Sequence, residues 1–334
     1  MGLHKESLSR GRESVDFQMV QERRLTFWSV YAFEITTCYG FGRPISINDC
    51  DISIPYPEDQ PFFLSVVMLA RIYARASRTL YGMRQGSLLA LWKAARGFKT
   101  EMDEWRSSLP AELAVGPDHV PAPGAPAADL AVLRTFLGTM YYHGVILTFR
   151  PFVIFHAQWL RGNHRLPDAA SVHVSARQLR ARAPWILEAC GYCVGAAREL
   201  LVCIAQDVER FDIVRRMRYG GFYIEGAAFL LIFNILRDRA DLAIDTRCVR
   251  LGLRAVDMIG DSVVSRICGE AIRHMLRLVE SDEEAAAAAA RSASGSSGGT
   301  SGAGTPMYVD SVPLVSLAVS PPRLALTCDG IGHD

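Results

Sequence analysis

Oxygen-bearing side chains alternate along SINDCDIS, residues 46–53, in a spacing that is typical of calcium-binding loops. A loop of that type also needs a central glycine and a bidentate glutamate at its twelfth position. Isoleucines and Pro55 fill the interval instead, and Glu58 falls at the wrong position. We therefore predict that no metal binds here and that Asp49 and Asp51 close local turns with their side chains.

Isoleucines flank the acidic residues of this stretch on both sides. Their alternation with polar residues is typical of an extended segment that has one apolar side. We predict that these side chains hold the segment against neighbouring helices. The isoleucines are Ile45, Ile47, Ile52 and Ile54.

Cys190 and Cys193 form a lone CxxC pair. A structural zinc site needs four ligands, normally from a second such pair, and Cys203 is the one further cysteine nearby. A redox role would require a βαβ context, which the sequence does not predict. Nearly all of the 8 cysteines fall in apolar helical patterns, where a thiol packs as a small hydrophobic group. We therefore predict reduced core cysteines.

The 8 histidines form no HExxH pair, and no GxSxG elbow, Walker loop or dinucleotide-binding glycine pattern occurs. His143, in MYYHGV, is predicted to be a core or interface residue with one ring nitrogen bonded to a backbone carbonyl. Acidic neighbours such as Glu101 and Asp103 fall on a polar helix face. We predict no catalytic residue, metal ligand or cofactor-binding residue, and therefore no enzyme.

The elements that position these residues are predicted to be helices, because apolar residues recur with a period near 3.6 and no alternating strand pattern accompanies them. Gly42 and Pro44 end the first helix, and Pro184 interrupts a later one. The predicted helical segments are 15–39, 62–81, 88–109, 129–151, 175–211, 219–236, 246–259 and 262–279. The predicted fold is all-α, an irregular multi-helix bundle with long connecting loops.

The composition changes at residue 281. The stretch SDEEAAAAAARSASGSSGGTSGAGTP is acidic, then alanine-rich, then rich in serine and glycine, so it offers no face that could pack. We therefore divide the chain into a helical domain, residues 1–280, and a low-complexity disordered tail, residues 281–334.

The overall charge is balanced, with 36 Lys and Arg against 35 Asp and Glu in 334 residues. No global field would draw the chain to nucleic acid or to an anionic membrane. The longest apolar run, residues 222–236, is too short to span a bilayer and contains Glu225. We predict that it is a core helix and that the chain has no membrane partner.

Residues 22–59 resemble the hallmark segment of the fungal-specific transcription factor domain. This domain is the middle homology region of fungal zinc-cluster regulators such as the xylanolytic activators. The family pattern opens with charged residues and tryptophan, continues with G-R-P and closes with acidic residues and spaced prolines. The matching residues are Glu22, Arg23, Arg24, Trp28, Gly42, Arg43, Pro44, Asp49, Asp51, Pro55 and Pro57. Looser resemblances follow in MGLH, WRSSLP, YYHGVILTFRPF and CVGAA.

The resemblance implies that these residues are structural. Trp28 would be a large buried anchor. Arg43 would bridge backbone carbonyls or the carboxylate of Asp49 or Asp51. Pro55 and Pro57 would stiffen the connector in an extended form.

The resemblance also implies a function, the regulatory domain of a nuclear DNA-binding factor that controls transcription by RNA polymerase II. The DNA reader of the family is a six-cysteine cluster that holds two zinc ions, and the sequence contains no such run. We therefore expect an N-terminally truncated member that has no cofactor of its own. Zinc, and DNA as a partner, would belong to a full-length parent with that cluster.

Homodimers, co-regulator proteins and a small-molecule inducer are the other partners that the family allows. An inducer pocket could form among large aromatic residues, although their helical spacing favours plain core packing. These residues are Trp28, Tyr31, Tyr141, Tyr142 and Phe149.

Two alternative functions remain open at this stage. The chain could be a protein-interaction module, or a dominant-negative fragment, that acts without binding DNA. A less favoured alternative is an all-α enzyme, which would need paired carboxylates such as a DDxxD run. The sequence contains no such run, and its acidic cluster at residues 282–284 falls in the predicted tail.

Overall fold

The computed structural model describes residues 3–5, 17–82, 87–116, 128–160, 183–217, 220–259 and 263–294. Within these ranges all regular secondary structure is helical, which confirms the all-α prediction. The α-helices are α1 (Phe17–Phe41), α2 (Pro61–Ser77), α3 (Leu88–Ser107), α4 (Ala128–Leu160), α6 (Pro184–Arg210), α7 (Gly220–Arg237), α8 (Leu242–Met258) and α9 (Val263–Ser294). Shorter turns include the 3₁₀ turn η1 (Asp49–Asp51) and the π turn η2 (Arg78–Gly82).

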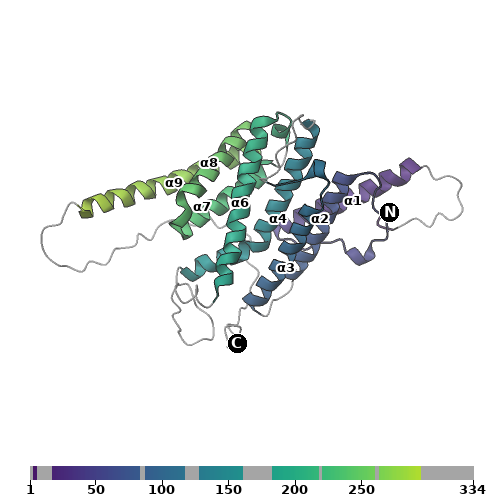
Figure 1. Cartoon of the computed structure of the whole chain (residues 1–334), viewed down its shortest axis with the longest axis horizontal. Coiled ribbons are helices and arrows are strands. Elements are labelled where there is room, and N and C mark those ends of the chain that lie inside the picture. The colour runs from purple at the N-terminus through teal and green to yellow at the C-terminus, as the bar shows by residue number, and fades with distance from the viewer. Residues whose placement is uncertain are drawn as a thin grey trace.

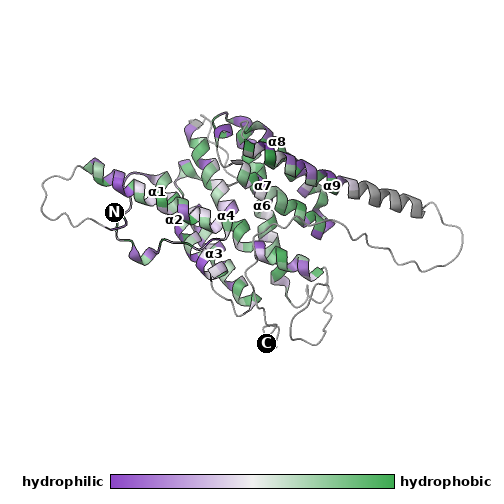
Figure 2. Cartoon of the chain, turned by 180° about the vertical axis from the view of Figure 1, so that it is seen from behind, coloured by the Kyte–Doolittle hydropathy of each residue, from purple (hydrophilic) through white to green (hydrophobic). Residues whose placement is uncertain are grey.

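α4 and α6 lie side by side at the centre of the bundle and form its most extensive helix contact (Figure 1). α1, α2 and α3 lie to one side of this pair, and α7, α8 and α9 lie to the other. Hydrophobic residues dominate the inner helices, whereas hydrophilic residues are frequent along α8 and α9 (Figure 2). One continuous apolar core runs through both halves.

α4 and α7 are long and apolar enough, by length and composition, to cross a membrane, so the apolar run at residues 222–236 is not too short once its helix extends from Gly220 to Arg237. In α4, 72% of the most apolar window is buried inside the bundle, and in α7 the share is 56%. Their composition is therefore explained by packing against protein, as predicted for the apolar run at residues 222–236.

α4 continues past Pro151, where the sequence pattern predicted its end. Proline normally breaks a helix because it lacks the N–H that would bond the carbonyl four residues earlier. That carbonyl belongs to Leu147, and it accepts the hydroxyl of Tyr81 from the π turn η2 instead. The prediction was wrong because a tertiary partner satisfies the orphaned carbonyl.

α9 extends to Ser294, beyond both the helix end predicted at residue 279 and the tail predicted from residue 281. Alanine has the highest helix propensity of all residues, so an alanine run prolongs a helix without needing a packed face. The predicted domain boundary therefore falls inside a helix. Residues 295–334, the rest of the predicted tail, lie outside the described part of the chain.

Gly144 allows α2 and α4 to approach closely. A Cβ atom at this position would overlap the ring of Tyr73, which projects from α2. The Tyr73 hydroxyl donates a hydrogen bond to the carbonyl of Met140, one turn earlier in α4. A larger residue at position 144 would therefore separate the two helices.

Candidate functional site

The segment that joins α1 to α2 carries most of the predicted motif residues. Gly42 ends α1 in a left-handed conformation, with φ of 64°, which glycine adopts without steric cost. The following amide, of Arg43, donates to the carbonyl of Cys38 over 2.8 Å, as in many helix C-terminal caps. From Pro44 the chain runs without regular secondary structure to η1, which Asn48 and Ile52 flank in extended conformations, and then on to α2.

Trp28 anchors this connector to α1. The indole is 3% exposed, and its Nε1 donates to the carbonyl of Pro55 over 3.0 Å. The Tyr56 ring lies against it, with ring centroids 4.7 Å apart. The Trp28 side chain thus both buries apolar surface and satisfies a connector carbonyl. Pro57 of the connector is also buried.

Asp49 reaches the neighbouring helices. Its carboxylate accepts the Tyr31 hydroxyl over 2.7 Å and lies 3.8 Å from the Arg71 guanidinium of α2. Burial, followed by this hydrogen bond, raises the pKa of Tyr31. The predicted local side-chain turn is therefore wrong for Asp49, because Tyr31 offers a partner from another element.

Backbone groups close the η1 turn instead. The amide of Asp51 donates to the carbonyl of Asn48 over 3.1 Å, and the amide of Ile52 donates to the carbonyl of Asp49 over 3.3 Å. The Asp51 side chain is exposed, and no hydrogen bond links it to another described residue. Its predicted side-chain turn is therefore also absent.

The Arg43 side chain is exposed and makes no hydrogen bond or ion pair with any described residue, so the predicted bridge is wrong. Other arginines hold the connector. Arg78 donates to the carbonyl of Ile47 over 2.9 Å, and Arg24 pairs with Glu58 over 2.7 Å. Arg71 also donates to the Tyr56 hydroxyl. Sequence reasoning missed Arg71 and Arg78 because they lie downstream of the motif.

The connector isoleucines pack as predicted. Ile54 is buried at 6% exposure, and the other three are half-buried against the core. Two motif residues have lesser roles. Glu22 is exposed and accepts a hydrogen bond from Gln18 within α1, and Pro44 is exposed.

The short stretch around His4 completes the assembly. The carbonyl of His4 accepts the amides of Ser53 and Ile54 over 2.9 and 3.2 Å. The Arg23 guanidinium donates to the carbonyl of Lys5 over 3.1 Å. His4, the last residue of the MGLH resemblance, therefore contacts the hallmark segment in space.

His143 is buried in α4, with its ring against Phe222 and Tyr223 of α7. Neither ring nitrogen has a hydrogen-bond partner among the described residues, so the predicted bond to a backbone carbonyl is wrong. Burial, with a smaller contribution from the positive charge of Arg150, lowers the pKa of His143 to about 3. The imidazole is therefore neutral at physiological pH.

The CxxC cysteines are buried core residues, as predicted. Burial raises the pKa of Cys190 to about 11 and also raises that of Cys193, so both remain thiols. The Cys193 thiol faces the carbonyl of Ile146 over 3.5 Å. Nowhere among the described residues do three or more His, Cys, Asp or Glu side chains gather as metal ligands.

The aromatic residues considered for an inducer pocket are all buried in the core. Trp28 borders a hollow of about 150 Å³, which is also lined by Asp49, Tyr56 and Arg71. A larger hollow lies elsewhere, between α6 and α8.

A buried polar network in the C-terminal half was not predicted from the sequence. Asp245 of α8 is fully buried and accepts Arg198 Nε over 2.6 Å and Asn234 Nδ2 over 2.8 Å. Arg198 also pairs with Asp241 over 2.8 Å. Acidic residues recur along amphipathic helices, usually on the exposed face, so nothing in the local sequence marks Asp245 as buried.

The residues described so far define an all-α domain in which some of the motif residues, among them Trp28 and Asp49, hold the connector between helices. Comparison with known proteins agrees with this class. Residues 1–106 match the model of the fungal specific transcription factor domain, which confirms the resemblance of residues 22–59. The match covers α1, the connector, α2 and nearly all of α3.

Protein STB5 of Saccharomyces cerevisiae is 26% identical to this chain over 116 residues. The aligned region covers 31% of this chain and 16% of that protein. No solved structure matches the chain significantly.

Proposed function

We propose that this chain is the regulatory domain of a fungal transcription factor that controls RNA polymerase II transcription in the nucleus. The observation that carries the proposal is the family match over residues 1–106. Within that region Trp28, Asp49 and the connector backbone form a closed structural framework. A domain built in this way suits the transmission or restraint of activity through its surface.

Under this proposal, zinc and direct DNA contact belong to a six-cysteine module, which the printed sequence does not contain. The helical domain itself would contact proteins, a second copy or a small-molecule inducer. The net charge of +1 supports this division, because DNA binding requires several unpaired cations on one face.

A non-catalytic role is part of the proposal. Among the described residues Cys190 and Cys193 have raised pKa values and His143 has a lowered one, so these groups carry no charge at neutral pH. The less favoured enzyme alternative draws no support from such groups. The interaction-module alternative is also non-catalytic. It differs from the proposal because it involves no full-length parent with a DNA-binding module.

A tethering experiment tests the proposal. The full chain is fused to an unrelated DNA-binding domain, and transcription of a reporter with matching sites is compared with that driven by the DNA-binding domain alone. We expect the fusion to raise or lower transcription, and a reporter without the sites to stay unchanged. An unaltered reporter, with the fusion present in the nucleus, would contradict a regulatory role.

A gel-shift experiment with the isolated chain tests whether the chain itself binds DNA. We expect no retardation of duplex DNA at physiological salt, because the net charge of the chain is only +1. Retardation that weakens steeply with added salt would show that the chain reads DNA through its own surface and would overturn the proposed division of labour.

A further inference from the structure

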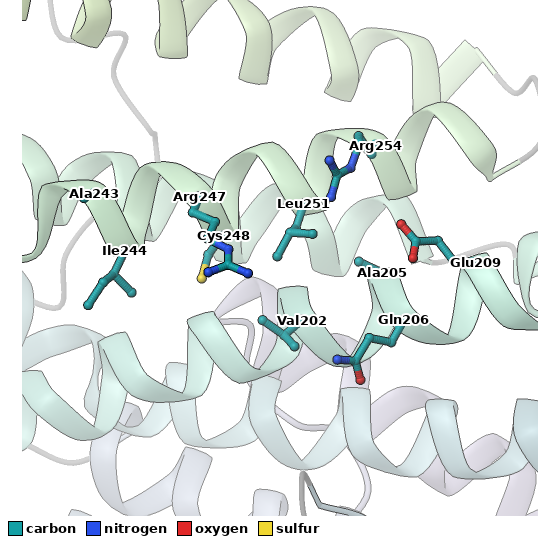
Figure 3. A pocket seen from close by; sticks show the side chains of 10 residues that line it. All are labelled: Val202, Ala205, Gln206, Glu209, Ala243, Ile244, Arg247, Cys248, Leu251 and Arg254. Carbon is teal, nitrogen blue, oxygen red and sulfur yellow. The ribbon is translucent and has the colours of Figure 1, made fainter.

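A groove of about 590 Å³ lies between α6 and α8 (Figure 3). Its floor consists of apolar side chains from both helices, including Val202, Ala205 and Leu251. Ile244 stands at one end and is 52% exposed. The groove therefore presents apolar surface to the outside of the bundle.

The charged residues of α8 differ sharply in their pairing. Asp245 pairs with Arg198, Arg250 with Glu280, and Asp257 with Arg273. The two remaining charged residues, Arg247 and Arg254, line the groove and have no hydrogen bond or ion pair with any described residue. The unpaired cations of this helix thus lie beside the apolar floor.

The opposite wall carries Gln206 and Glu209 of α6. Glu209 lies toward the same end of the groove as Arg254, whereas Arg247 lies nearer the middle, beside Cys248 and above Val202 (Figure 3). The carboxylate of Glu209 partly offsets the positive charge at its own end. Glu209 is the one carboxylate among the residues that line the groove, and it lies away from Arg247.

We propose that this groove binds an amphipathic helix of a partner protein that carries acidic side chains beside an apolar stripe. A helix in a groove buries its apolar face, and arginine suits bidentate contacts with carboxylates. Arg247 and Arg254 are seven residues apart, about 10 Å along α8, so carboxylates two turns apart on the partner would match them. This inference names the class of partner that the proposed regulatory domain would bind. The binding itself is argued from the groove, and only its role in transcription rests on the proposed function.

Peptide binding tests the proposal with the full chain. The probe is a fluorescein-labelled helix of roughly 18 residues, five turns long, with leucines along one stripe and glutamates spaced two turns apart beside it. A matched peptide carries lysine in place of each glutamate. We expect fluorescence anisotropy to show saturable binding of the glutamate peptide, weakened by added salt, and much weaker binding of the lysine peptide.

Variants on the two walls should act in opposite directions. Arg247→Gln should weaken binding of the glutamate peptide by about threefold, as expected for an exposed ion pair. Glu209→Gln should tighten binding, because it removes a like charge. Arg250→Gln is the matched control on α8, since Arg250 pairs with Glu280 and does not line the groove. Ile244→Gln should weaken binding of both peptides.

A charge reversal distinguishes a change in binding preference from a loss of folding, because an unfolded variant would not gain affinity for either peptide. The double variant Arg247→Glu, Arg254→Glu should prefer the lysine peptide over the glutamate peptide. Equal affinity of the wild-type chain for both peptides, or equal effects of Arg250→Gln and Arg247→Gln, would overturn the proposal. A dimer in light scattering that Ile244→Gln dissociates would instead assign the groove to a second copy and also overturn it. None of these outcomes affects the reporter test of the proposed function.

Discussion

At the scale of single residues, the connector depends on a few polar atoms in an otherwise apolar setting. Trp28 Nε1 and the Tyr31 hydroxyl each make one hydrogen bond to a connector group, over 3.0 and 2.7 Å. Removing a donor leaves a shielded acceptor without a partner, which costs more than the bond itself contributes. These two residues should therefore be more sensitive to substitution than their exposed neighbours.

Trp28→Phe should lower the free energy of unfolding by about 2 kcal/mol, because it removes buried surface and leaves the Pro55 carbonyl unpaired. Urea unfolding followed by circular dichroism measures the change. Ser29→Ala, at the adjacent exposed position of α1, is the control and should change stability by less than about 0.5 kcal/mol. Similar effects of both substitutions would contradict the anchoring role of Trp28.

His143 makes the stability of the fold dependent on pH. Burial lowers its folded-state pKa to about 3, against about 6.5 in an unfolded chain. Between these values the unfolded state binds the proton and the folded state does not. The stabilisation is therefore fully present above pH 6.5 and is lost as the pH falls, by up to about 1.4 kcal/mol per pH unit.

The variant His143→Leu cannot titrate at this position and should show a shallower loss of stability between pH 6 and pH 4.5. The measurement is the free energy of unfolding in urea across that range for both proteins. Because slopes are compared, a constant packing cost in the variant does not affect the result. Parallel curves would mean that His143 binds its proton equally in both states.

At the scale of elements, α4 shows how a tertiary partner preserves a helix. Pro151 leaves the Leu147 carbonyl without its usual N–H donor, and the Tyr81 hydroxyl from η2 takes that place. The π turn that carries Tyr81 also carries Arg78, which holds the connector at Ile47. One irregular turn therefore supports both the central helix and the motif segment.

A double-mutant cycle tests whether the Tyr81 hydroxyl takes the place of the backbone N–H that Pro151 lacks. Tyr81→Phe alone should cost about 1–3 kcal/mol, because the Leu147 carbonyl loses its donor inside the protein. In a Pro151→Ala background the restored backbone N–H can bond that carbonyl, so the same change should cost less. Additive effects in chemical unfolding would show that the two groups do not share an acceptor.

At the scale of the whole molecule, the buried network around Asp245 links three helices of the C-terminal half. Arg198 belongs to α6, Asn234 to α7 and Asp245 to α8. Arg237, which also bonds Asn234, contacts His156 at the end of α4. A buried ion pair of this kind constrains how helices align, since a charge without its partner is costly inside a protein.

Asp245→Asn should lower the melting temperature far more than Asp257→Asn, which removes the exposed pair with Arg273. We expect a loss of about 3 kcal/mol in the first case and less than about 1 kcal/mol in the second. Differential scanning calorimetry of the two variants measures both. Equal melting temperatures would show that the network adds little to the alignment of α6, α7 and α8.

Sequence alone determined the helical class, the approximate helix positions and the motif that identifies the family region. Helical periodicity and short motifs are local properties, so they can be recognised without knowledge of what packs where. Sequence alone also indicated that the connector isoleucines and the CxxC cysteines would pack inward, because apolar patterning surrounds them.

Only the tertiary structure decided which polar groups meet. Asp49 finds Tyr31, Arg43 finds no described partner, Asp245 becomes buried and His143 keeps two unpaired nitrogens. The same holds for the persistence of α4 past Pro151 and for the groove that leaves Arg247 and Arg254 unpaired. Each of these outcomes depends on contacts between residues far apart in the chain, and local periodicity carries no information about such pairs.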